Sequence, residues 1–191
     1  VVLLAQGLRF PSAEWVHTDP TTSANAIANN PGFNFNRREM LKTRSFYALW
    51  ATYTIGCLAG LMAIGIASPV GTEVVKLDAT TAAFAVSLFA VFNGLGRPLF
   101  GIVADKFGPK LSAMISFALI LGASLLLSKL EEGNTSLYLI AFCTLWLCLG
   151  GWLALAPTST GIFFGKHYYA QNYGIVYTAY GVGAILGTLI S

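Results

Sequence analysis

Five stretches of apolar residues recur along this sequence, and each approaches the length that a helix needs to cross a lipid bilayer. A helix that rises about 1.5 Å per residue needs around 20 apolar residues to cross a hydrocarbon core about 30 Å thick. Only 10% of the residues are charged, whereas soluble domains carry about 25%. We therefore predict an all-α membrane protein with five transmembrane helices. The predicted spans cover residues 46–67, 81–103, 111–127, 137–156 and 173–190.

The residues before the first span differ in character from the rest. Residues 1–10 are mostly apolar but lack the basic lead-in and small-residue cleavage site of a signal peptide, so we expect them to end a preceding transmembrane span. Residues 11–45 are rich in Asn, Thr, Ser and Pro and indicate a linker. Residues 46–191 form the predicted membrane bundle. Because the sequence stops inside an apolar run, we expect a fragment of a longer protein, with one closing span absent.

Basic residues predict the orientation, because cytoplasmic loops carry an excess of Lys and Arg. If residues 11–45 are cytoplasmic, the outer loops hold only Lys76 and Lys129, together with four acidic residues. We therefore expect a multi-pass protein of the plasma (inner) membrane with residues 11–45 in the cytoplasm. The basic residues of the inner side are then Arg9, Arg37, Arg38, Lys42, Arg44, Lys106, Lys110 and Lys166.

The sequence lacks the residue patterns that several classes of protein function require. The net charge of +3 is scattered, without the basic patch of a nucleic-acid-binding protein, so we expect no nucleic-acid partner. The three cysteines lie in apolar stretches without the close Cys/His pairing of a zinc site, so we expect buried thiols and no metal. The sequence has no Ser-His-Asp arrangement, no phosphate-binding glycine loop and no pair of carboxylates within a span. We expect neither an enzyme nor a cofactor.

Glycines four residues apart predict close helix packing, because small residues let helices approach each other in lipid. The alternative is that they leave room for a pathway or for movement between bundles. The pairs are Gly56 with Gly60, Gly161 with Gly165, and Gly183 with Gly187. Pro157 predicts a kink or an end in the fourth span.

The short turn after the second span carries the pattern G-x-x-x-D-K-x-G-x-K. Its glycines, acid and bases are Gly101, Asp105, Lys106, Gly108 and Lys110. Gly101 leaves space for another helix to cross, and the Asp105 carboxylate can accept hydrogen bonds at the N-terminus of a neighbouring helix. Gly108 is expected to end one helix in a left-handed conformation, and Pro109 to begin the next.

This pattern resembles the cytoplasmic loop signature of the major facilitator superfamily, between the second and third spans of a six-span half. The resemblance implies a partial six-helix bundle of the major facilitator fold, in which the five motif residues form a conformational latch between two bundles. Lys110 stands where arginine is more usual, which keeps the charge but gives up bidentate geometry. The alternative is an ordinary interfacial turn.

A narrower resemblance covers most of the chain. The segments that carry it are "AQGLRFP" at 5–11, "REMLKTRSFYALW" at 38–50, "FNGLGRPLFG" at 92–101, "GGWLALAPTSTGIFFGKHYYAQNYG" at 150–174 and "NYGIVYTAYGVGA" at 172–184. They are similar to the oxalate/formate antiporter family and its monocarboxylate-carrying relatives. The resemblance implies secondary active transport of a small carboxylate by alternating access, with a coupled proton or an exchanged anion. The alternative is a transport-incompetent sensor or receptor on the same scaffold.

Arg97 is the candidate substrate-binding residue. It precedes Asp105 by eight residues, about 12 Å along a helix, and a guanidinium inside a span costs a few kcal/mol unless it meets an anion, a polar cavity or the interface. One reading is that Arg97 extends toward the cytoplasm. The other, which the resemblance implies, is that it faces a central cavity and binds a carboxylate. Asn93, one turn earlier, is its polar neighbour.

The tyrosines of the fifth span are the remaining candidates. Tyr173, Tyr177 and Tyr180 recur at helical spacing, so their hydroxyls either line a cavity or belong to ordinary packing. Oxalate carriers of the family show a lysine where Tyr180 stands. A single cation in this part of the chain suits a monoanion better than a dianion, so we expect a small monocarboxylate.

Overall fold

The computed structural model describes residues 34–190, and within them the chain forms helices and no strand. The long helices are α4 (Arg44–Pro69), α5 (Ala79–Phe107), α6 (Pro109–Leu127), α7 (Thr135–Phe164) and α8 (Tyr169–Ile190). Helix α4 continues into a π-helical turn, η1 (Val70–Val74), and a short helix, α3 (Arg37–Met40), precedes it. All five long helices are long and apolar enough to cross a membrane, which confirms the predicted all-α fold with five transmembrane helices. The expected end of a preceding span, residues 1–10, lies outside the described residues.

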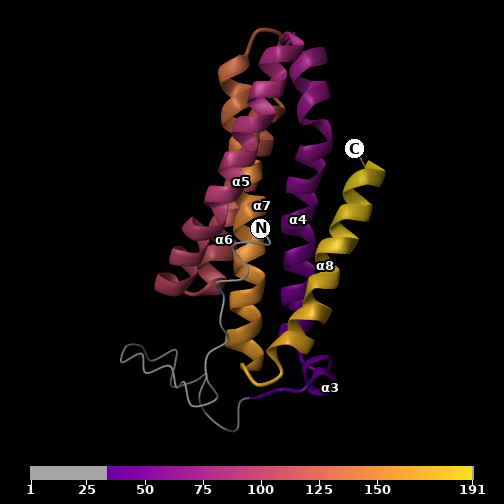
Figure 1. The fold of residues 1–191 in the computed structure, drawn as a ribbon, viewed down its shortest axis with the longest axis vertical. Helices are drawn as coiled ribbons and strands as arrows, with labels where there is room; N and C mark the ends of the chain where they lie inside the picture. The colour runs from indigo at the N-terminus through magenta and orange to yellow at the C-terminus, as the bar shows by residue number, and fades with distance from the viewer. Residues whose placement is uncertain (1–33, 191) are drawn as a thin grey trace, which may run out of the picture.

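Helix α7 forms the centre of the bundle. In Figure 1 it runs between α5 and α6 on one side and α4 and α8 on the other. In its most apolar part 67% of α7 is buried, against 17% for both α5 and α6. A helix that is apolar on all sides is suited to such a central position. The other helices each keep one face toward α7 and another toward the surroundings.

Glycines let the central helices approach closely. A β-carbon on Gly96 of α5 would collide with the carbonyl oxygen of Leu147 in α7, and one on Gly150 of α7 would collide with that of Asn93. The crossing of α5 and α7 therefore depends on the absence of two side chains, as expected for helices that associate in lipid.

Two of the three predicted glycine pairs pack helices together. Gly56 and Gly60 of α4 lie under Trp152 and Leu149 of α7, and Gly183 and Gly187 of α8 lie against α4. The third pair differs from these two. A β-carbon on Gly161 would meet the ring of Tyr169, the first residue of α8, only at 3.8 Å, so close approach does not require a glycine there. Gly165 instead ends α7, with φ 83°.

The turn between α5 and α6 depends on Gly108. This residue ends α5 and precedes α6 with φ 83° and ψ 161°. The positive φ confirms the need for glycine, but the ψ value differs from the expected left-handed helical conformation and belongs to a region that only glycine adopts readily. Pro109 occupies the first turn of α6, as predicted. Pro157 does not end its helix, since α7 continues to Phe164.

The segment before α4 packs against the ends of α7 and α8. Asn36 caps α3 by accepting hydrogen bonds from the backbone of Arg38 and Glu39. The backbone N–H of Phe35 donates to the carbonyl of Phe164 over 3.0 Å, and the side chain of Asn172 donates to the carbonyl of Phe35 over 2.8 Å. The last part of the predicted linker is therefore docked on the bundle.

Candidate functional site

Arg97 lies within the α5 helix and its side chain is exposed. Within residues 34–190 it forms no ion pair and no side-chain hydrogen bond, so the guanidinium is available to a further partner. Because an arginine inside a transmembrane helix costs a few kcal/mol without an anion, a polar cavity or the interface, this position calls for such a partner.

Asn93 lies one turn before Arg97 but is held by another helix. Its Nδ2 atom donates a hydrogen bond to the carbonyl oxygen of Trp146 in α7 over 3.2 Å. The residue is half-buried beside the glycine crossing of α5 and α7. One of its two amide hydrogens is therefore used to join the helices, and the other remains free to meet a ligand.

The tyrosines of α8 form a continuous row of rings. The centroids of Tyr169 and Tyr173 are 5.8 Å apart, those of Tyr173 and Tyr177 5.7 Å, and those of Tyr177 and Tyr180 5.4 Å. Tyr177 is 43% exposed, whereas Tyr173 and Tyr180 are half-buried. The row therefore presents phenol groups along one face of α8.

Arg97 belongs to α5, and the row of phenols belongs to α8, which lies on the other side of α7 (Figure 1). The candidate residues thus form two groups, a cation on one helix and phenols on another. A guanidinium and neutral hydroxyl donors are a combination that can bind a carboxylate.

Tyr53 of α4 adds a polar group that sequence reasoning missed. It is fully buried, and its ring stacks on Trp152 at a centroid distance of 6.2 Å. It belongs to the core cluster against which Tyr173 and Tyr180 of α8 pack. In the sequence Tyr53 looks like any aromatic residue of an apolar span, so no local signal could have identified it.

The five latch residues lie at and just beyond the end of α5. Asp105, Lys106 and Lys110 are exposed, and the Nζ atom of Lys106 lies 5.3 Å from the ring centroid of Phe107. A β-carbon on Gly101 would meet no atom within 4 Å. In the part of the chain that the structure describes, no helix crosses Gly101 and no group pairs with Asp105. This surface is therefore open for another element.

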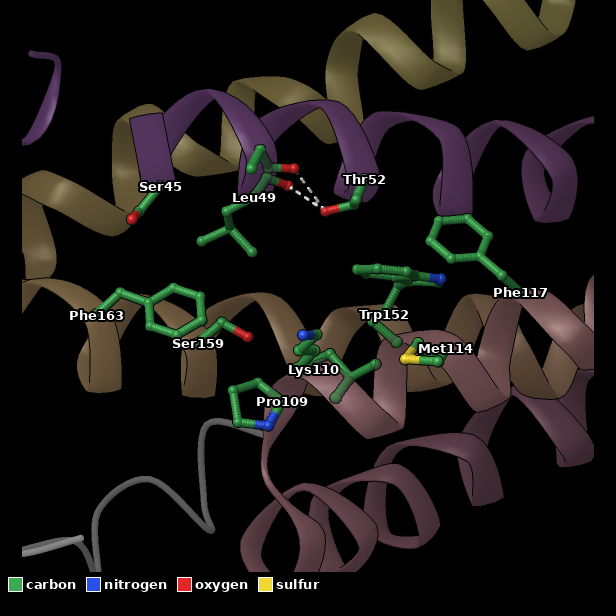
Figure 2. Close-up of a pocket in the computed structure, with 13 residues that line it drawn as sticks. Ser45, Leu49, Thr52, Pro109, Lys110, Met114, Phe117, Trp152, Ser159 and Phe163 are labelled. Carbon is green, nitrogen blue, oxygen red and sulfur yellow. Dashed lines mark hydrogen bonds between the residues drawn. The ribbon is translucent and has the colours of Figure 1, made fainter. Parts of the chain in front are cut away.

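A separate groove of about 380 Å³ lies between α4, α6 and α7. Figure 2 shows Trp152 and Phe163 of α7 facing Leu49 of α4, with Met114 and Phe117 of α6 beside them. The Thr52 hydroxyl donates to the carbonyls of Ala48 and Leu49 rather than to the groove. None of the lining residues belongs to α5 or α8, so the groove is distinct from the Arg97 region.

Residues 34–190 offer few side chains for metal binding or thiol chemistry. Residues 34–190 contain no group of three His, Cys, Asp or Glu side chains that could hold a metal ion. The three cysteines are free and buried, as expected from their apolar surroundings. The polar chemistry of the membrane-spanning part is thus concentrated in the arginine, the asparagine and the tyrosines.

Five apolar helices that alternate in direction along the chain, an arginine inside one of them and a stiff charged turn define a polytopic membrane protein. The chain belongs to the Major Facilitator Superfamily, whose family description matches residues 12–191. The fold and the loop motif agree with that membership.

The chain resembles three curated proteins. It is 29% identical to the oxalate:formate antiporter of Oxalobacter formigenes, over 98% of this chain and 43% of that protein. It is 28% identical to the uncharacterized MFS-type transporter YhjX of Escherichia coli (strain K12), over 80% of this chain and 38% of that protein. It is 31% identical to an uncharacterized 38 kDa protein in the 23S RNA operon of Thermoproteus tenax, over 80% and 37%. The chain therefore spans about four-tenths of the length of these relatives.

Proposed function

We propose that this chain belongs to the second half of a secondary active transporter that moves a small organic anion by alternating access. Arg97 is the anion anchor in this proposal. The observation that carries it is an exposed guanidinium inside a transmembrane helix, without an ion-pair partner in residues 34–190. A bound carboxylate would offset the cost of placing that charge in the membrane.

The substrate class follows from the charge of the site. One relative is named as an oxalate:formate antiporter. In this half Arg97 is the one cation within the described spans outside their terminal turns, and Tyr180 stands where oxalate carriers of the family have a lysine. One fixed positive charge suits a monoanion, so the proposed substrate is a monocarboxylate. An exchanged anion or a coupled proton would complete the cycle.

The other site residues act as hydrogen-bond donors in this proposal. Tyr177 and Tyr180 offer phenolic O–H groups from α8, and Asn93 offers the amide hydrogen that it does not donate to Trp146. A charged anchor with a few neutral donors fixes both the position and the orientation of a carboxylate. The phenols also allow an apolar substituent to lie against their rings.

Uptake or exchange of labelled monocarboxylates by the full-length protein in proteoliposomes tests the anchor. Arg97→Ala should raise the apparent KM at least about tenfold, because a charge-assisted hydrogen bond contributes about 1.5–3 kcal/mol. Arg97→Lys should restore part of the affinity, since it keeps the charge but loses the planar fork. Lys129→Ala, which removes a basic residue outside the spans, is the matched control. Unchanged saturable uptake with Arg97→Ala would refute the anchor.

The turn after α5 acts as the conformational latch in this proposal. Asp105 is exposed and Gly101 leaves an open surface, so both can meet the other bundle of the complete transporter. Lys106, Gly108 and Lys110 give the turn its charge and stiffness. Asp105→Asn should slow exchange severalfold while leaving the apparent KM unchanged, because the latch does not contact substrate. A changed KM at an unchanged maximal rate would contradict this role.

A further inference from the structure

Four basic side chains follow one another closely where the chain enters α4, and all four are exposed. Within residues 34–190 these side chains form no ion pair and no hydrogen bond. Glu39, the one acidic residue of this stretch, instead accepts a hydrogen bond from the backbone N–H of Asn36 over 2.8 Å. We call the four residues the basic collar: Arg37, Arg38, Lys42 and Arg44.

The backbone that carries the basic collar is held against the bundle. Met40, in the middle of the collar, is fully buried and belongs to the core cluster that also contains Phe46. Just before the collar, the Asn34 side chain accepts a hydrogen bond from the backbone N–H of His167 over 3.2 Å. Thr43 caps α4 by accepting from the backbone N–H of Phe46 over 3.2 Å. The four cations are therefore kept together by packing and hydrogen bonds.

Helix α4 turns an apolar face outward directly after the collar. Tyr47 is 60% exposed and Ile55 is 57% exposed, and Ala51 between them is exposed as well. These residues follow Arg44 at intervals of three or four residues, so all of them lie on one face of the helix. The collar thus stands at the end of an exposed apolar strip about 16 Å long.

We propose that the basic collar binds the phosphate group of an anionic phospholipid whose acyl chain lies along the exposed apolar strip of α4. Guanidinium groups bind phosphate oxygens through paired, charge-assisted hydrogen bonds. A membrane surface that contains anionic lipids attracts basic residues beside a transmembrane helix. Tyr47 lies between the charged and the apolar part, as is typical of tyrosine at the membrane interface. This inference does not rest on the proposed function, because it concerns the lipid and not the transported anion.

The apolar strip favours a phospholipid over a soluble phosphate compound. A soluble phosphate would meet the charges of the collar but would leave Tyr47 and Ile55 uncovered. In a bilayer the exposed side chains of a spanning helix contact acyl chains, and a phospholipid with its chain at this strip brings its own phosphate to the collar. The order of cations, tyrosine and apolar residues along α4 therefore matches the order of groups along the lipid.

Thermal unfolding of the full-length protein in nanodiscs tests the proposal. Nanodiscs of phosphatidylcholine are compared with nanodiscs in which about a third of the lipid is anionic phosphatidylglycerol, which should raise the thermal midpoint of the wild type. Arg37→Gln with Arg38→Gln should lose at least about half of that rise, because it removes two of the four cations. Each variant is compared with itself in the two lipids, so a general loss of stability does not affect the result.

Lys76→Gln with Lys129→Gln is the matched control, because it removes two exposed cations at the other end of the bundle. This control should keep the full rise. Native mass spectrometry should likewise show phosphatidylglycerol retained by the wild type and the lysine control and lost from the arginine variant. An equal rise in the wild type and the arginine variant would overturn the proposal.

A soluble headgroup distinguishes the lipid from a free phosphate. Glycerol phosphate added to phosphatidylcholine nanodiscs should leave the midpoint of the wild type unchanged, because it has no acyl chain to lie along α4. A rise equal to that with phosphatidylglycerol would overturn the assignment to a lipid. None of these measurements involves transport, so their failure would leave the proposed function intact.

Discussion

The glycines of this bundle differ in how much free space an added β-carbon would find. That space determines whether a substitution by alanine is tolerated. A β-carbon on Gly96 or Gly150 would collide with backbone atoms of the facing helix, which cannot rotate away as a side chain does. A β-carbon on Gly94, two residues from Gly96 in the same helix, would meet nothing within 4 Å. Gly94 therefore has room for a methyl group, whereas Gly96 of the same helix does not.

Gly96→Ala should destabilise the bundle by at least about 1–3 kcal/mol, because it forces α5 away from α7. Gly94→Ala is the matched control and should leave stability unchanged or raise it, since alanine is the better helix former by about 1 kcal/mol. Thermal midpoints of the purified proteins in detergent measure both effects. Equal midpoints for the two variants would show that the helices do not cross at Gly96.

At the scale of the element, α5 depends on a carboxylate cap outside its membrane-spanning part. Asp78 accepts hydrogen bonds from the Thr81 hydroxyl and from the backbone N–H groups of Thr81 and Thr80. These bonds, with the Thr81 hydroxyl contributing most, hold the pKa of the Asp78 carboxyl below its ordinary value of 3.8. Protonation therefore weakens the cap.

The cap predicts a dependence of stability on pH. Because the pKa of Asp78 is lowered by folding, its contribution is complete above 3.8 and is lost as the pH falls through the lowered value. Asp78→Asn keeps a capping side chain without a titratable charge. The stability advantage of wild type over Asp78→Asn should thus shrink below pH 3.8 in thermal unfolding measurements. A difference that stays constant down to pH 2 would contradict the prediction.

At the scale of the whole molecule, the two ends of the bundle differ in their charged residues. Lys106 and Lys110 lie at the end where α5 meets α6, which is also the end of α3 and of the start of α8 (Figure 1). The opposite end carries Lys76 and Lys129 among acidic residues. This distribution supports the expectation that residues 11–45 are cytoplasmic.

Labelling with a membrane-impermeant maleimide tests that orientation in intact cells. The Lys129→Cys variant should react with the reagent added outside the cells. The Lys110→Cys variant should react only after the cells are permeabilised. The three native cysteines are buried, so their background reaction should be low. The parent protein without the added cysteine measures that background. Reaction at Lys110 in intact cells would reverse the proposed orientation.

The number of spans and the stiff turn at Gly108 were predictable because they depend on local properties. The length of an apolar run decides whether a helix can cross the bilayer, and the backbone angles at Gly108 and Pro109 follow from covalent structure. The continuation of α7 past Pro157 was not predictable in this way. Contact of Phe164, in the last turn of α7, with Phe35, which belongs to another segment, accompanies that extension: the Phe35 N–H donates to the Phe164 carbonyl and the two rings lie 6.3 Å apart.

The sequence by itself determined that this chain forms five membrane-spanning helices with an arginine inside one of them. Only the tertiary structure decided that Asn93 binds α7, that Tyr53 lies in the core against which tyrosines of α8 pack, and that Gly161 has room for a methyl group. The physical reason is the rotation of each helix about its own axis. A helix that is apolar on every side gives no sequence signal for the face that it turns toward its neighbours. That face is chosen by close packing and by a few hydrogen bonds between residues far apart in the chain.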